Sequence, residues 1–296
     1  MQSILVFDLG GSSIKYGVWR GDNVTQTDSI ATPDSWKKMK EELKKIQSQL
    51  GKENDFLGVA ISSPGAVDID EGIIKGNSAI WYIHHFPIKQ ELSELFELPV
   101  SLQNDANCAA LAEVWKGAAK DVETSAYMII GSGIGGAYVS GGKLITGRHL
   151  FGGEFGWMLL NDNLTLSEGG SPVKMAERFS EERADRKYTG KEVFELFDQG
   201  DDMAVKHIDT MLDSLARGVY NLCICFDADR YLIGGGISKR PDVIDKIVNL
   251  TNFYLKRQAA DDIKPSIQAC KFFNDSNLIG AVYQFLLENP NLKNLL

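Results

Sequence analysis

The alternation of apolar and polar residues near the start of the chain predicts two β-strands joined by a tight turn. Residues 4–10 (ILVFDLG) are mostly apolar, contain strong β-formers and end in glycine. Apolar positions alternate in residues 13–19, which places Ile14, Tyr16 and Val18 on one face of a strand. The chain therefore opens with a strand, a glycine turn and a second strand.

Apolar residues at helical spacing predict a helix after these strands. Met39, Leu43, Ile46 and Leu50 form one stripe, which is typical of a helix that buries a single face. The elements predicted up to residue 115 are this helix over 35–50, a strand over 56–63, a short strand ending at 101–103 and a helix over 106–115.

The pattern of strand, glycine turn and strand starts again in residues 126–147, which predicts a duplicated α/β architecture. We expect a small N-terminal domain over 1–115 and a large C-terminal domain over 116–296, whose last helix, over about 277–296, can pack back on the first domain. The other predicted elements are a polar loop over 161–175, a long helix over 203–226, a strand and glycine turn over 230–238, and helices over 241–256 and 277–288.

Composition and charge narrow the class of protein. A chain of 296 residues exceeds the usual size of one hydrophobic core, and 44% hydrophobic with 24% charged residues is ordinary for a soluble globular protein. The net charge of -9 argues against nucleic-acid binding, because an acidic surface repels phosphates. No apolar run could span a membrane, no signal peptide precedes the first strand, and the four cysteines lack a paired spacing. We therefore expect a cytoplasmic protein with reduced thiols.

Three glycine clusters follow predicted strands, over residues 8–12, 131–136 and 234–238. Successive N–H groups in such turns form a concavity that binds anions, although one cluster alone is equally typical of an ordinary hairpin. The clusters match neither a Walker loop, since no Gly-Lys-Ser or Gly-Lys-Thr occurs, nor a dinucleotide fingerprint, since the first two clusters open strands rather than helices. Together they indicate phosphate binding over β-hairpins.

Six motifs, in this order and spacing, resemble the ROK family of sugar kinases. They are DLGGSS (8–13), SSPGAVD (62–68), QNDANCAALAE (103–113), GSGIGG (131–136), GGEFGW (152–157) and IGGGIS (233–238). The resemblance extends from residue 4 to about 284. It implies the two-domain actin-like and hexokinase-like ATPase fold, with two RNase H-like domains around a cleft. It also implies ATP and Mg²⁺ in the cleft, a sugar beside the hinge and a homodimer.

The resemblance further implies the residues that bind ATP. Asp8 matches a residue near the metal-bound phosphates and is expected to interact with Mg²⁺ through ATP. The third turn is expected to pack on the adenosine. The expected ATP-binding residues are Asp8, Gly10, Gly11 and Ser12 in the first turn, Gly131, Ser132, Gly133, Gly135 and Gly136 in the second, and Gly234, Gly235 and Gly236 in the third.

Asp105 is the expected catalytic residue. From the spacing alone, an N-cap of the following helix is the favoured role. The resemblance implies instead a general base, which takes the proton of a sugar hydroxyl as it attacks the γ-phosphoryl group. The residues expected to bind the substrate are Gly65, Ser78, Asn104, Asp105, Glu154 and Trp157.

The chain departs from the family where most members carry a structural zinc site. The usual histidine is replaced by Trp157, and the usual cysteine cluster by residues 164–175, which contain no cysteine, so we expect no structural zinc. Val173 takes the place of a glutamate that binds the sugar near its anomeric hydroxyl. An aromatic face at Trp157 with fewer polar contacts suits a sugar that is substituted at its anomeric hydroxyl. This combination is similar to the β-glucoside kinases of the family, which phosphorylate the 6-hydroxyl of cellobiose or gentiobiose.

Other acceptors and one other class remain open. A glucokinase, a fructokinase or an N-acetylmannosamine kinase would fit the same motifs. A sugar-sensing repressor of the family would carry a DNA-binding domain before the first strand, where this chain has three residues. The acidic charge and the three glycine turns also favour an enzyme over a repressor.

Overall fold

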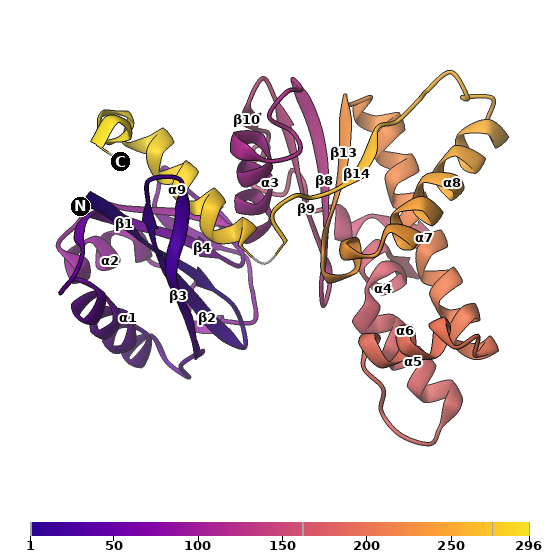
Figure 1. Ribbon diagram of the computed structural model, residues 1–296, viewed down its shortest axis with the longest axis horizontal. Helices are drawn as coiled ribbons and strands as arrows, with labels where there is room; N and C mark the ends of the chain where they lie inside the picture. The colour runs from indigo at the N-terminus through magenta and orange to yellow at the C-terminus, as the bar shows by residue number, and fades with distance from the viewer. Residues whose placement is uncertain (1, 162, 274, 296) are drawn as a thin grey trace. The chain divides into compact units, whose positions relative to one another are not determined.

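The computed structural model describes residues 2–161, 163–273 and 275–295, and the chain divides into two units. Unit 1 consists of Met1–Gly117, Arg148–Leu150 and Asn274–Leu296, and unit 2 of Ala118–Gly147 and Phe151–Phe273. Each unit contains its own five-stranded mixed sheet (Figure 1).

Unit 1 is a sheet with helices on both faces. Its strands run in the order β3 (Asn23–Ala31), β2 (Ser13–Arg20), β1 (Gln2–Leu9), β4 (Asp55–Ser63) and β7 (Val100–Asn104). The first three strands are antiparallel, whereas β4 and β7 run parallel to β1. A short hairpin, β5 (Ala66–Asp68) and β6 (Ile73–Lys75), and a 3₁₀ turn, η1 (Trp81–Ile83), follow β4.

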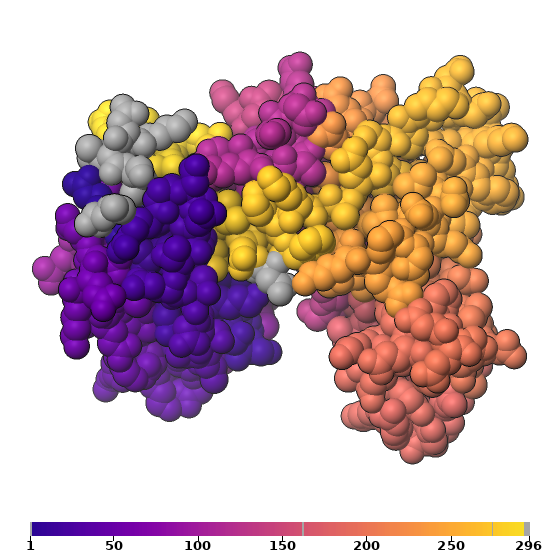
Figure 2. Space-filling view, viewed as in Figure 1, coloured from indigo at the N-terminus to yellow at the C-terminus, as the bar shows by residue number. Residues whose placement is uncertain are grey.

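The two faces of this sheet carry different helices. Leu5 and Phe7 join the buried cluster that includes α1 (Trp36–Leu50) and α2 (Ile88–Phe96). On the other face α3 (Asp105–Lys116) packs against α9 (Ser276–Glu288), which contacts β1, β4 and β7. Figure 2 shows this yellow C-terminal helix lying along the indigo N-terminal strands.

Unit 2 repeats the topology of unit 1. Its strands run in the order β10 (Lys143–Leu144), β9 (Ile134–Ser140), β8 (Thr124–Ile130), β13 (Arg230–Gly235) and β14 (Ile267–Ala269). Again the first three strands are antiparallel and the other two run parallel to the central strand. The prediction of a duplicated α/β architecture is therefore confirmed.

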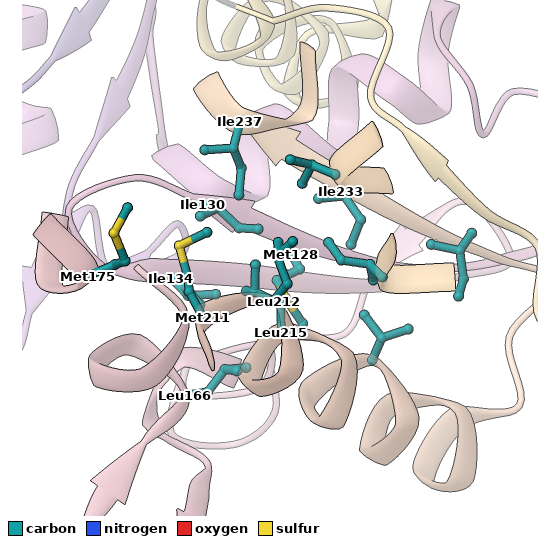
Figure 3. Close-up of a cluster of buried hydrophobic side chains, with 14 of the residues drawn as sticks. Met128, Ile130, Ile134, Leu166, Met175, Met211, Leu212, Leu215, Ile233 and Ile237 are labelled. Carbon is teal, nitrogen blue, oxygen red and sulfur yellow. The ribbon is translucent and has the colours of Figure 1, made fainter. Parts of the chain in front are cut away.

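The helices of unit 2 pack on its sheet and form a large apolar core with it. They are α4 (Leu166–Gly170), α5 (Pro172–Arg183), α6 (Gly190–Asp198), α7 (Asp202–Phe226) and α8 (Pro241–Arg257), with short 3₁₀ turns η2 (Phe155–Trp157) and η3 (Gly236–Lys239). In Figure 3, Met128 and Ile130 of β8 lie close to Met211, Leu212 and Leu215 of α7. No helix of the described residues is long and apolar enough to cross a membrane.

The prediction of a polar loop over 161–175 is wrong. Apart from residue 162, which lies outside the described residues, this segment contributes to a small hairpin, β11 (Leu159–Asn161) with β12 (Leu164–Thr165), and to α4 and α5. Thr165 and Glu168 form a capping box that starts α4, and Ser171 caps α5. Both start signals are present in the sequence, but the glycines between them favoured the prediction of a loop.

The contact between α3 and α9 tests the packing of unit 1. A Cβ added at Gly280 would stand 1.7 Å from the backbone oxygen of Cys108. We therefore expect Gly280→Ala to force the helices apart and lower the free energy of unfolding by about 1–3 kcal/mol, seen in urea denaturation. Gly236→Ala is the control, because a Cβ there meets nothing within 4 Å. Equal losses in the two variants would contradict the close packing of α9 on α3.

Candidate functional site

The carboxyl ends of three parallel strands bring together the polar residues of unit 1. Asp8 pairs with Ser62 in the register of β1 and β4, and Ser63 pairs with Asn104 in the register of β4 and β7. Parallel strands end at the same edge of a sheet, and ligands of α/β proteins bind at such edges. Residues 8, 62 and 104 are therefore neighbours in space, although they are far apart in the sequence.

Asp8 is held in one orientation and is only 8% exposed. Its Oδ1 accepts hydrogen bonds from Ser62 Oγ (2.8 Å) and from Asn277 Nδ2 at the start of α9 (3.1 Å). Burial raises the pKa of the Asp8 carboxyl, while these hydrogen bonds and the charge of Lys15 oppose the shift. A buried carboxylate held by neutral donors is suited to binding a cation.

The first glycine turn joins β1 to β2 and is open to solvent. Gly10 N donates to Ser13 O (3.0 Å), which closes the turn. A Cβ at Gly11 would stand 2.6 Å from Ala79 Cβ, so glycine allows the turn to lie against the residue that follows Ser78. The exposed residues of the turn are Gly11 and Ser12.

Asn104, not Asp105, caps α3. Asn104 Oδ1 accepts from Asn107 N (3.0 Å), and its Nδ2 donates to Gly65 O (3.0 Å). Asp105 is the first residue of the helix, and its Oδ1 accepts from Ala106 N (2.8 Å). The N-cap role that the spacing favoured for Asp105 is therefore wrong, because the preceding asparagine fills it.

Gly65 and Ser78 meet through a histidine that we did not predict as a site residue. Ser78 Oγ lies 2.8 Å from His84 Nε2. Gly65 has a φ of 99°, and a Cβ there would stand 2.8 Å from His84 Cε1. Burial lowers the pKa of His84, so its ring is neutral near pH 7. No motif in the sequence marks this histidine, since its role depends on the loop that brings it to Ser78.

The second glycine turn, between β8 and β9, lies at the start of α5. The N-cap hydroxyl Ser171 Oγ is 2.9 Å from the carbonyl oxygens of both Gly131 and Ser132. Ile134 N donates to Ser167 Oγ (3.0 Å), which fixes the other end of the turn. The positive end of the α5 dipole therefore lies beside a solvent-exposed glycine turn, an arrangement that favours a bound anion.

A pocket of about 540 Å³ in unit 2 is lined by Gly131 of the second turn and Gly236 of the third. Its size lies in the range of small-molecule sites. The third turn requires glycine, because Gly235 has a φ of 91° and a Cβ there would stand 1.9 Å from Ile130 O. The apolar residues of the lining are Ile130, Pro172, Val173, Phe194 and Ile237. Apolar walls next to two glycine turns suit a flat ring that carries phosphates.

Arg240 fixes one side of this pocket. Its guanidinium donates two hydrogen bonds to the carboxylate of Asp198 (2.9 and 2.6 Å) and two to that of Asp242 (3.1 and 2.8 Å). It also lies over the ring of Phe194, 4.9 Å from the ring centroid. These contacts tie the start of α8 to the end of α6, and no sequence motif predicted them.

Residues 152–157, which we term the glycine–glutamate segment, lie directly on β9. A Cβ at Gly136 would stand 2.5 Å from Gly153 O, and one at Gly153 would stand 2.9 Å from Gly136 O. A Cβ at Gly156 would stand 2.0 Å from Ile134 O. The glycines thus allow two backbones to touch, which fixes the segment that carries Glu154 and Trp157.

Glu154 is a half-buried carboxylate without a protein partner. Among the residues that the structure describes, none donates a hydrogen bond to its carboxylate or forms an ion pair with it. Burial raises the pKa of the Glu154 carboxyl above that of an ordinary glutamate. An unpaired carboxylate of this kind is a candidate for binding ligand hydroxyls. Trp157, three residues later, is 70% exposed.

Val173, the second residue of α5, lines the pocket with Gly131 and Gly236, which belong to turns that were expected to bind ATP. Ser167 lies beside the glycine–glutamate segment, because its Oγ would stand 2.3 Å from a Cβ at Gly156.

No group of three or more His, Cys, Asp or Glu residues in the described part of the chain is placed to hold a metal ion. Cys108, Cys223 and Cys270 are buried and Cys225 is exposed.

Comparison with known proteins identifies relatives along the whole chain. Residues 4–287 match the ROK family. A β-glucoside kinase of Listeria innocua is 33% identical over 298 aligned residues, which cover 96% of this chain and 98% of the relative.

Solved structures agree with this match. A ROK family protein from Streptococcus pneumoniae TIGR4, in complex with sucrose, has a TM-score of 0.88 at 33% identity, with 98% of this chain and 99% of that chain covered. A ROK family glucokinase from Streptomyces griseus, in complex with glucose and AMPPNP, has a TM-score of 0.79 at 22% identity, with 94% and 97% covered. The predicted two-domain hexokinase-like fold is therefore confirmed.

The raised pKa of Glu154 predicts how stability changes with pH. The folded protein holds this proton to higher pH than the unfolded chain, whose ordinary value is 4.5, so stability is lost as the pH rises through the folded pKa. We expect Glu154→Gln to gain stability over the wild type between about pH 4 and pH 7, measured by urea denaturation across that range. The exposed Glu123→Gln is the control. An unchanged difference across the range would show that the carboxylate is not desolvated.

Proposed function

The chain belongs to the ROK family and is a sugar kinase of that family, and we propose that its acceptor is a β-glucoside such as cellobiose or gentiobiose, phosphorylated on the 6-hydroxyl by ATP. The observation that carries this proposal is the glycine–glutamate segment, where an unpaired carboxylate lies three residues from an exposed indole. The carboxylate accepts sugar hydroxyls, and the indole packs on a C–H face of a ring. A relative supports the same acceptor, since the Listeria innocua protein is named a β-glucoside kinase.

The pocket in unit 2 is the proposed site of the adenosine of ATP. Its apolar walls suit a purine, and the glycine turn of residues 131–136 at its edge suits phosphates. The start of α5 adds a favourable dipole to that turn. In unit 1, the turn of Gly10, Gly11 and Ser12 is the proposed second phosphate contact.

Asp8 fits the role of holding Mg²⁺ through ATP. It is a carboxylate, the ligand type that Mg²⁺ prefers, and its neighbours Ser62 and Asn277 are neutral donors that leave its charge available. When bound, Mg²⁺ would neutralise charge on the phosphates. The protein's own part is to keep this carboxylate oriented and largely shielded from water.

Asp105 is the proposed general base. Because Asn104 caps α3, the Asp105 carboxylate is not needed for that role. Its proposed function is to accept the proton of the 6-hydroxyl as the oxygen attacks the γ-phosphoryl group. Asn104, Gly65 and Ser78 are proposed to position sugar hydroxyls, with His84 orienting Ser78. Glu154 is proposed to bind hydroxyls from unit 2.

Replacing the base separates chemistry from binding. We expect Asp105→Asn to lower kcat by about 10²–10⁴-fold, because the amide cannot take the proton, with little change in KM for ATP. A coupled ADP-release assay with Mg-ATP and cellobiose measures both constants. The exposed Asp262→Asn serves as the control. Retained activity in Asp105→Asn would refute the assignment of the base.

The same assay with several acceptors tests the substrate. We expect kcat/KM for cellobiose or gentiobiose to exceed that for glucose, fructose and N-acetylmannosamine. If free glucose or N-acetylmannosamine gives the highest value, the chain is a kinase of that sugar and the β-glucoside proposal fails.

Filling the unit 2 pocket tests the nucleotide site. Val173 is 44% exposed on its wall, so Val173→Trp should fit on the protein while reducing the free volume. We expect KM for ATP to rise at least about tenfold, equivalent to about 1.4 kcal/mol of binding, while KM for the sugar changes little. Ile224→Trp, at a 52% exposed position of α7, is the matched control. An unchanged KM for ATP in Val173→Trp would place the nucleotide elsewhere.

A further inference from the structure

Two exposed aromatic rings contact each other beside the glycine–glutamate segment. Phe151 is 50% exposed and Trp157 is 70% exposed, and their rings meet edge to face with centroids 5.8 Å apart. Apolar surface left in water costs about 25 cal/mol per Å², and clustered aromatic rings on a surface are typical of binding sites. The pair is therefore a candidate binding surface for a ligand with an apolar face.

Backbone geometry places Glu154 with this pair. Glu154 N donates to Phe151 O (3.1 Å), and Trp157 N donates to Glu154 O (3.1 Å). Gly153, with a φ of 101°, turns the chain between Phe151 and Glu154, and the second hydrogen bond closes the short turn η2. The chain therefore turns twice between Phe151 and Trp157, which brings their rings into contact, and Glu154 lies between them in the sequence.

The segment that carries the rings is fixed by its glycines. Gly152 N donates to Thr146 O (2.8 Å), and a Cβ at Gly152 would stand 2.7 Å from Ile145 O. A Cβ at Gly153 or at Gly156 would stand 2.9 Å or 2.0 Å from a backbone oxygen of β9. Because the backbone of this segment is already held in place before a ligand binds, the entropic cost of binding is lower.

We propose that Phe151 and Trp157 together form the subsite for the ring attached to the glucose, and that Phe151 is a specificity-determining residue. This proposal rests on the β-glucoside acceptor proposed above. Glu154 binds the glucosyl unit, and the aglycone packs against the two rings. Because the surface offers aromatic rings rather than polar partners, it accepts both a second sugar ring, through its C–H face, and an aromatic aglycone. The substrate class is therefore β-glucosides with a ring-shaped aglycone, aryl β-glucosides included.

The experiment compares four acceptors in the wild type and in variants of the pair. The acceptors are glucose, methyl β-glucoside, cellobiose and phenyl β-glucoside, each measured as kcat/KM. We expect the wild type to favour cellobiose and phenyl β-glucoside over methyl β-glucoside and glucose. In Phe151→Ala and Trp157→Ala we expect the ratio of each ring-bearing acceptor to glucose to fall about tenfold. Phe151→Leu, which keeps an apolar side chain, should lose more with phenyl β-glucoside than with cellobiose.

The control is Phe253→Ala, at a 56% exposed phenylalanine on α8, which should keep the wild-type ratios. Thermal melting shows that each variant is folded. If the wild type favours the ring-bearing acceptors but both alanine variants keep its ratios, the subsite is refuted while the β-glucoside acceptor stands. If the wild type favours glucose over every β-glucoside, the acceptor and the subsite are both refuted.

Discussion

Direct contact between backbones is the constraint on which the unit 2 site depends. Gly136 and Gly153 each have the other's carbonyl oxygen where a Cβ would stand, and Gly156 has the oxygen of Ile134. Any side chain at these positions would lift the glycine–glutamate segment from β9 and displace Glu154 and the aromatic pair with it. The third turn obeys the same rule, because Gly235 lies against the backbone of Ile130 and so brings the pocket wall to the end of β8.

The site contains charges that the fold does not satisfy. Glu154 is half-buried and has no partner among the residues that the structure describes, and Asp8 is buried with neutral donors, so the pKa of each carboxyl is raised. Both groups reduce the stability of the folded chain at neutral pH, and the apolar cores of the two units offset that loss. Such groups are expected at ligand-binding sites, since sugar hydroxyls and a cation can supply the hydrogen bonds and the positive charge that the protein does not provide.

Duplication of the sheet explains why the functional residues recur at equivalent places. In each unit a central strand forms a hairpin with one neighbour and runs parallel to the other, so a glycine turn and the ends of parallel strands lie at one edge. In unit 1 this edge carries Asp8, Ser62 and Asn104, and in unit 2 it carries the turns at Gly131 and Gly235. Strand topology, rather than any one motif, thus places polar groups from distant segments together.

The sequence by itself determined the strands beside the glycine turns and the long helices, because hydrophobic periodicity and the turn requirement for glycine are local properties, but it did not reveal α4 and α5. It also determined the family, through motifs that retain their order along the chain. Only the tertiary structure decided which of two adjacent residues caps α3, that Val173 lines a pocket while Ser167 contacts Gly156, and that His84 reaches Ser78. It also revealed that Phe151 meets Trp157 and that Arg240 joins α6 to α8. These facts depend on how segments fold back on one another, and a pattern read along one segment carries no information about which distant side chain fills the space beside it.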